Sequence, residues 1–181
     1  MGHVARIPHV AKSADLSFLR EISLLKDLEE PQLVALWPRL RERRLRKSEV
    51  LFREGDPGEE MFFIRTGTIL VSKVVSGRVE QILSRLQAGD VFGEMSVFGD
   101  EPIRTATIQA ENEASLLSLD RKSINEFIEA NPKDAARLFQ QLVVVLIRRL
   151  VQSSQLVSEV TRWGLEATGL DAERKSGGSS R

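Results

Sequence analysis

Three residues that could bind a phosphorylated sugar lie close together in the stretch VFGEMSVFGDEPIRTATIQA, residues 91–110. Gly93 has no side chain, so the backbone there can approach a ligand closely. Glu94 could accept hydrogen bonds from a pair of sugar hydroxyls, and Arg104 offers a planar fork that matches phosphate oxygens. Together these residue types suit a small ligand that carries both a phosphate and a ribose. A surface ion pair between Glu94 and Arg104 would account for the same residues without a ligand.

The segment between these residues predicts a short helix followed by a turn. Residues 95–98 form a run too short to be a stable helix by itself, so it depends on its surroundings. The backbone amides at the start of such a run have no partners within it, and they favour negative charge. The turn-rich residues 99–102 follow, and a β-type run begins at Thr105.

The stretch FGEMSVFGDEPIRTAT resembles the phosphate-binding cassette of cyclic nucleotide-binding domains. This family includes bacterial catabolite activator proteins, regulatory subunits of protein kinase A and cyclic nucleotide-gated channels. The resemblance covers roughly Leu24 to Leu150 and includes the motifs GDPGEEMFFIRTGTILV, LQAGDVFGE and NPKDAARLFQQL in the family's order. It implies that the ligand is cyclic AMP (cAMP) or cyclic GMP (cGMP).

The resemblance also assigns roles to individual residues. Glu94 would accept the ribose 2′-hydroxyl while Gly93 makes room, and Arg104 would pair with the exocyclic oxygens of the cyclic phosphate. Thr105 would add a hydroxyl and a backbone amide beside them. Further ligand-binding residues implied by the family pattern are Met95, Ser96 and Ala106 in the cassette, Val71, Leu83 and Leu86 beside the sugar and base, and Trp163 as a lid. For Val71, Leu83 and Leu86 the alternative is plain core packing, and for Trp163 it is packing at the helix end or in the dimer seam.

The base that the site prefers stays open. In the family, a threonine at the position of Thr105 can hydrogen-bond the 2-amino group of a syn guanine, which admits cGMP, whereas cAMP is the commoner bacterial ligand. A polar pair on the long helix reads adenine in some relatives. At the position of the long helix that corresponds to this polar pair, the present chain has Arg149 and Leu150. Ser153 and Ser154 follow one helical turn later.

Short apolar runs with glycines at the turns predict an α+β fold, in which an antiparallel β-barrel of the jelly-roll type is flanked by helices. The expected strands are 50–52, 61–64, 68–75, 78–86, 91–92, 105–110 and 114–119. Before them we expect two short helices, one with Asp15 as its N-cap and one that starts at Glu30–Pro31 and is kinked or ended by Pro38.

Two further helices should follow the last strand. Asp120 is placed to cap a helix over residues 123–129, and Asn131–Pro132 should start a long helix that runs beyond Leu156. Apolar residues recur along it at spacings of four and three, interrupted only by a serine: Phe139, Val143, Leu146, Leu150, Ser153, Val157 and Val160. This heptad seam predicts a homodimer through the long helix. A second apolar stripe lies beside it, at Leu138, Leu142 and Val145, and both stripes could instead pack within one chain.

We therefore expect an N-terminal tail at residues 1–14, one domain over residues 15–163, and a flexible tail from residue 164 onward. Gly164 and Gly169 should break the long helix, and the polar residues 171–181 should be disordered.

The composition excludes several classes of protein. The chain has 181 residues, no cysteine, and histidine only at His3 and His9, so a cysteine- or histidine-clustered metal site is not expected. Lys+Arg and Asp+Glu both number 26, which gives no overall attraction to nucleic acid or membranes. The basic run at residues 39–47 is more typical of a solvated strand face than of a nucleic-acid patch. No apolar run is long enough to span a bilayer, and a cytoplasmic location is the default.

We predict a stand-alone cyclic nucleotide sensor that moves its C-terminal helix and is read by an unidentified protein partner. Only about thirty residues follow Leu150, too few for the helix-turn-helix domain that catabolite activators carry there. No catalytic constellation is recognisable, so we do not expect an enzyme. The alternatives are a DNA-binding transcription regulator of the catabolite activator type and an interaction module with a vestigial pocket.

Overall fold

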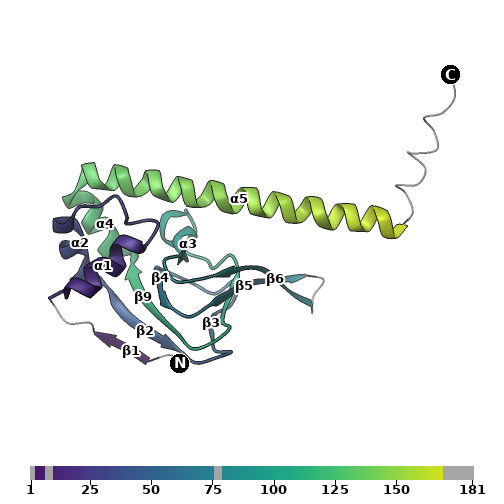
Figure 1. Ribbon diagram of the computed structural model, residues 1–181, viewed down its shortest axis with the longest axis horizontal. Helices are drawn as coiled ribbons and strands as arrows, with labels where there is room; N and C mark the ends of the chain where they lie inside the picture. Colours follow the sequence, from purple (N-terminus) through teal and green to yellow (C-terminus); the bar gives the residue numbers. More distant parts are fainter. Residues whose placement is uncertain (1–2, 7–9, 76–78, 169–181) are drawn as a thin grey trace, which may run out of the picture. The chain divides into compact units, whose positions relative to one another are not determined.

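A computed structural model describes residues 3–6, 10–75 and 79–168 of the chain, and it divides the chain into two units. The first unit extends to Leu142 and the second begins at Val143. The elements, drawn in Figure 1, are β1 (His3–Arg6), α1 (Ser13–Glu21), α2 (Glu30–Leu36), η1 (Trp37–Arg39), β2 (Arg41–Leu45), β3 (Val50–Phe52), β4 (Glu60–Thr66), β5 (Ile69–Val75), β6 (Val79–Leu86), β7 (Val91–Phe92), α3 (Glu94–Phe98), β8 (Thr107–Ala110), β9 (Ala114–Asp120), α4 (Arg121–Ala130) and α5 (Pro132–Thr168).

The strands of the first unit form two antiparallel sheets. One sheet has five strands in the order β1-β2-β9-β4-β7, and the other has four in the order β3-β8-β5-β6. The predicted jelly roll is confirmed, with the refinement that its strands divide into two sheets and do not close into one barrel.

The interior between the sheets is filled by alternate residues of their strands, as the pleat requires. Phe62 and Ile64 of β4 belong to this core together with Ile69, Leu86, Ile108 and Leu116 from other strands. Phe52, Phe62 and Phe92 gather at one place, where the rings of Phe62 and Phe92 stack with centroids 5.1 Å apart. This aromatic cluster lies directly beneath the candidate site.

The other face of the five-stranded sheet carries a second apolar layer. Met61 and Phe63 alternate with the core residues of β4 and are fully buried, as are Leu117 and Leu119 of β9. Helices α1, α2 and α4 lie on this side (Figure 1), and they contribute buried residues such as Leu19 and Leu36. The N-terminal helices are therefore part of the packed unit.

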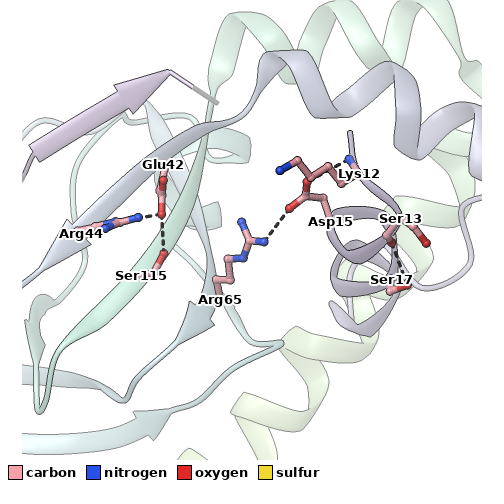
Figure 2. Close-up of polar contacts among 8 residues, drawn as sticks. All are labelled: Lys12, Ser13, Asp15, Ser17, Glu42, Arg44, Arg65 and Ser115. Carbon is pink, nitrogen blue, oxygen red and sulfur yellow. Dashed lines mark hydrogen bonds and ion pairs between the residues drawn. The ribbon is translucent and has the colours of Figure 1, made fainter. Parts of the chain in front are cut away.

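A partly buried ion pair attaches α1 to the sheet. In Figure 2 the Arg65 side chain reaches from β4 toward Asp15, and its Nη2 lies 2.6 Å from Oδ1 of Asp15. The other carboxylate oxygen accepts the backbone amide of Lys12 at 3.1 Å. The prediction that Asp15 is the N-cap is wrong: α1 starts at Ser13, and Asp15 reaches back from its first turn to the capping position.

The chain ends of the domain differ from the sequence prediction. His3–Arg6, which we assigned to a tail, is a strand that pairs with β2. Gly164 does not break the long helix, because α5 continues through it to Thr168. Gly169 and the polar residues 171–181 lie outside the described residues.

The remaining helix predictions are confirmed. The second helix starts at Glu30 and passes into a 3₁₀ turn at Trp37–Arg39, where Pro38 lies. The Asp120 carboxylate accepts the amide of Ser123 at 2.7 Å and caps α4, and α5 starts at Pro132.

The basic run is a strand, as predicted, and its arginines contact acids. Within β2, Arg44 lies 3.1 Å from Glu42, which also accepts the Ser115 hydroxyl (Figure 2). Arg43 lies 3.4 Å from Glu60. These carboxylates offset the positive charge that would attract a polyanion.

Candidate functional site

Arg104 is held in place by the loop between β3 and β4. Its backbone amide donates to the carbonyl of Asp56 at 2.9 Å, and its carbonyl accepts the amide of Gly55 at 2.9 Å. Beside it, the amide of Gly58 donates to the carbonyl of Pro102 at 2.8 Å. These bonds hold residues 102–104 against the loop between β3 and β4. The strand that follows, β8, begins at Thr107 and not at Thr105 as predicted.

The Arg104 side chain is buried, with only 6% of its surface exposed. Its Nη1 donates to the backbone carbonyl of Glu60 and to Oγ of Ser96, both at 2.7 Å. The guanidinium carbon lies 4.1 Å from the centre of the Phe52 ring, a cation–π contact. Among the residues that the structure describes, the buried Nε of Arg104 has no hydrogen-bond partner.

Burial lowers the pKa of the Arg104 guanidinium, while the nearby carboxylates of Glu60 and Asp56 oppose this shift. An arginine remains protonated near neutral pH even when its pKa is lowered. The site therefore holds a permanent positive charge, largely shielded from water, with an unused N–H donor. An anion that reached it would interact more strongly than at an exposed arginine.

Gly93 makes room for the guanidinium. It is the N-cap of α3, with a left-handed φ of +76° that glycine adopts without strain. A Cβ atom built at this position would lie 2.9 Å from Nη1 of Arg104 and 3.0 Å from the carbonyl oxygen of Glu60. The glycine is therefore needed for the backbone angle and for the space that Arg104 occupies.

Two side chains of α3 are buried beside Arg104. Ser96 is 2% exposed, and its hydroxyl donates to the carbonyl of Gly93 at 2.9 Å while accepting from Arg104. Glu94 is 3% exposed, so the alternative of a surface ion pair does not fit it. A carboxylate, a hydroxyl and a guanidinium thus lie within one short segment under the protein surface.

The exposed residues of the cassette lie around this buried set. Met95 is 53% exposed, and the Thr105 hydroxyl contacts its sulfur at 3.6 Å. Thr105 is exposed and Ala106 is half-buried. These side chains are accessible to a bound molecule, whereas Glu94, Ser96 and Arg104 would support it from below.

The remaining predicted site residues have three different environments. Leu86 belongs to the core between the sheets and Val71 packs against it, which fits the core alternative. Leu83 is the extra residue of a bulge, since Ser84 and Ile82 pair with successive residues of β5, and it is 40% exposed. Trp163 belongs to the second unit and is 64% exposed.

Sequence reasoning missed several residues that position the guanidinium. Glu60 acts through its carbonyl, which no side-chain pattern signals. A Cβ atom at Gly58 would lie 2.0 Å from Nε of Arg104, so the guanidinium passes directly against this glycine. Arg121 of α4 donates from Nη2 to the carbonyl of Ser96 at 2.6 Å and to that of Gly99 at 3.3 Å. The motif GDPGEE, residues 55–60, contains Gly58 and Glu60, but nothing in it indicates that they contact Arg104.

Residues 3–6, 10–75 and 79–168 contain no group of three or more histidine, aspartate or glutamate side chains arranged to hold a metal ion. No helix in these ranges is both long and apolar enough to cross a membrane.

Comparison with known proteins gives consistent matches. A family model described as "Cyclic nucleotide-binding domain" matches residues 42–131. Human cGMP-dependent protein kinase 2 is 33% identical over 114 residues, which cover 62% of this chain and 15% of the kinase. The CRP-like cAMP-activated global transcriptional regulator of Mycobacterium tuberculosis is 25% identical over 142 residues, which cover 78% of this chain and 61% of the regulator. This chain thus matches less than two thirds of either relative's length.

A solved structure of the regulatory domain of Toxoplasma gondii PKA with cAMP is also similar. It has a TM-score of 0.60 and 26% identity, and the match covers 66% of this chain and 47% of that one.

Proposed function

Because this chain carries a cyclic nucleotide-binding domain, we propose that it is a cyclic nucleotide sensor, with cAMP as the first candidate ligand and cGMP as the second. The ligand would bind in the cassette, residues 93–106, and binding would shift the long helix α5. The role would be regulatory and not catalytic, and the protein would act in the cytoplasm through a protein partner.

The buried, incompletely bonded guanidinium of Arg104 is the observation that carries this proposal. Its Nη1 is already engaged by Glu60 and Ser96, and the Phe52 ring lies against its carbon atom. The Nε–H has no partner among the described residues, and a buried donor without a partner is costly. A phosphate oxygen would satisfy this donor and compensate the buried charge.

A contact between α3 and the first turns of α5 supports the proposed output. Phe98, at the end of α3, packs edge-on against Phe139 with ring centroids 5.5 Å apart, and both residues belong to the first unit. A ligand that changes the position of α3 would act on Phe139 through this contact. Ligand binding would then bias the equilibrium between positions of α5, as differential affinity requires.

The second unit supports a homodimer through α5. Its apolar residues Leu146, Leu150, Val157 and Val160 recur at heptad spacing and are each more than one third exposed. A second copy could cover this seam by coiled-coil packing. Sedimentation equilibrium of the wild-type protein and a Leu150→Glu variant would test the dimer, since a charge in the seam should shift it to monomer.

Calorimetric titration with cAMP and, separately, with cGMP tests the ligand. Wild-type protein should bind one of them, and Arg104→Ala should weaken binding about 100-fold or more because the phosphate loses a buried charged partner. Arg20→Ala is the matched control, since Arg20 forms an exposed ion pair with Glu30 on the N-terminal helices. Equal affinity of Arg104→Ala and wild type would refute the assigned role. If neither nucleotide binds and the protein instead binds duplex DNA in a salt-dependent way, the DNA-binding alternative replaces the sensor.

A further inference from the structure

A pair of opposite charges lies between the two sheets, next to the candidate site. Arg43 of β2 alternates with the core residue Leu45 and is directly opposite the core residue Leu116, and Glu60 of β4 alternates with the core residue Phe62. Nη2 of Arg43 lies 3.4 Å from Oε2 of Glu60, and the two side chains are 26% and 25% exposed. The pair is therefore partly withdrawn from water, where charges interact more strongly than at the surface.

Glu60 uses three different oxygens for three different contacts. Its backbone carbonyl accepts Nη1 of Arg104 at 2.7 Å. Of its two carboxylate oxygens, Oε1 accepts the hydroxyl of Ser118 at 3.2 Å and Oε2 faces Arg43. Among the residues that the structure describes, no hydrogen bond or ion pair joins the Glu60 carboxylate to the Arg104 guanidinium. Arg43 and Ser118 thus occupy the carboxylate, and Arg104 uses only the backbone oxygen.

The Glu60 carboxylate is nevertheless close enough to act on Arg104. Burial lowers the pKa of the Arg104 guanidinium, and the Glu60 charge opposes this shift more than the Asp56 charge does. A carboxylate and a phosphate compete for the same donors, because both offer anionic oxygens to a guanidinium. If the Glu60 carboxylate turned toward Arg104, it would neutralise the buried charge that a phosphate needs.

Resting on the proposed function, we propose that Arg43 is a positioning residue for nucleotide binding, which holds the Glu60 carboxylate away from the Arg104 guanidinium. Ser118 supports it by binding the other carboxylate oxygen. The guanidinium and its buried Nε–H then stay available to the phosphate. Arg43 acts on the affinity through Glu60 and does not itself touch the ligand.

The proposal predicts that Arg43 matters only while Glu60 is charged. Arg43→Met should weaken nucleotide binding about 5- to 30-fold, less than a full charged hydrogen bond because the carboxylate is one quarter exposed. Glu60→Gln should instead bind about 2- to 5-fold more tightly, since it removes a negative charge near the phosphate and keeps the backbone carbonyl. In the Glu60→Gln protein, adding Arg43→Met should cost less than about threefold.

Calorimetric titration with cAMP and with cGMP measures wild type, the two single variants and the double variant. Thermal unfolding without ligand shows whether each variant is folded. Arg44→Met is the matched control, because it removes the same charge from the next residue of β2, on the opposite face of the strand. The Arg44 side chain is 70% exposed and pairs with Glu42, so its loss should change the affinity by less than about twofold.

A purely structural role of the Arg43–Glu60 pair predicts a different pattern, in which Glu60→Gln weakens binding as Arg43→Met does. That pattern, or an equal cost of Arg43→Met with and without Glu60→Gln, would overturn the inference. Should Arg43→Met fail to fold, Ser118→Ala, which frees the other carboxylate oxygen, is measured with the same expected dependence on Glu60. A wild-type protein that binds neither nucleotide would refute the proposed function and this inference together, whereas normal binding with the structural pattern refutes the inference alone.

Discussion

Replacing Arg104 by lysine tests the geometry of the site separately from its charge. Lysine keeps a positive charge, but its ammonium is compact and cannot form the planar fork of a guanidinium. In the native site, Nη1 donates two bonds of 2.7 Å, to Glu60 and Ser96, and the guanidinium carbon lies 4.1 Å from the centre of the Phe52 ring. The ammonium group of a lysine could not reach these two internal acceptors and the phosphate of the ligand at the same time.

The size of the effect follows from the bonds that are lost. Losing one or two hydrogen bonds to a charged group, each worth about 1.5–3 kcal/mol, should cost roughly 2–4 kcal/mol of binding free energy. This corresponds to a weakening of about 30- to 1,000-fold, since about 1.4 kcal/mol is tenfold. The Arg104→Ala variant should bind the nucleotide at least as weakly as Arg104→Lys, because it also removes the charge.

Calorimetric titration measures the affinity, and thermal unfolding without ligand shows whether the variant is folded. A folded Arg104→Lys protein with affinity within about threefold of wild type would show that only the charge matters, since one lost charged hydrogen bond already exceeds that factor. The assignment of the Nε–H and fork geometry to the phosphate would then be wrong.

Three further substitutions test other parts of the structure. Gly93→Ala forces a left-handed φ and a close contact with the cassette guanidinium, so urea unfolding should show a loss of about 2 kcal/mol and calorimetry at least tenfold weaker binding. Asp15→Asn leaves the half-buried Arg65 without its ion-pair partner, and the free energy of unfolding should fall by about 1–3 kcal/mol, compared with less than about 0.5 for the exposed pair broken by Glu30→Gln. Gly164→Ala should raise helix content in circular dichroism and add about 1 kcal/mol of helix stability, because α5 passes through this residue; no change would place the helix end before it.

The strands and helices were largely predictable because their signals are local. Alternating apolar residues and turn glycines fixed most strands to within two residues, and Asp120 and Asn131–Pro132 marked the starts of α4 and α5. Strand β1 was missed because His3–Arg6 has no alternation of its own and gains its conformation from pairing with β2. Gly164 was misjudged because one glycine costs a helix only about 1 kcal/mol relative to alanine, which a long helix tolerates.

The residue types of the candidate site could be predicted from the sequence, but the contacts that hold these residues in place could not. Glu94, Ser96 and Arg104 stood out because they lie in one contiguous motif. The contacts of Gly58, Glu60 and Arg121 were hidden, since they depend on how distant segments meet. Arg121 is 25 residues from Ser96 in the chain, and its bond is to a backbone carbonyl, a group that every residue has.

Both faces of strand β4 are packed against other parts of the first unit. Side chains of one parity, Phe62 and Ile64, fill the core between the sheets, and those of the other parity, Met61 and Arg65 among them, hold the helical layer. The backbone carbonyl of Glu60 in the same strand accepts a hydrogen bond from the guanidinium of the site. A substitution in β4 should therefore change nucleotide affinity and folding stability together, because both depend on the same backbone. Across a library of β4 variants, apparent dissociation constants should rise as melting temperatures fall. Ranking such variants by affinity would then require correcting each value for the fraction of folded protein.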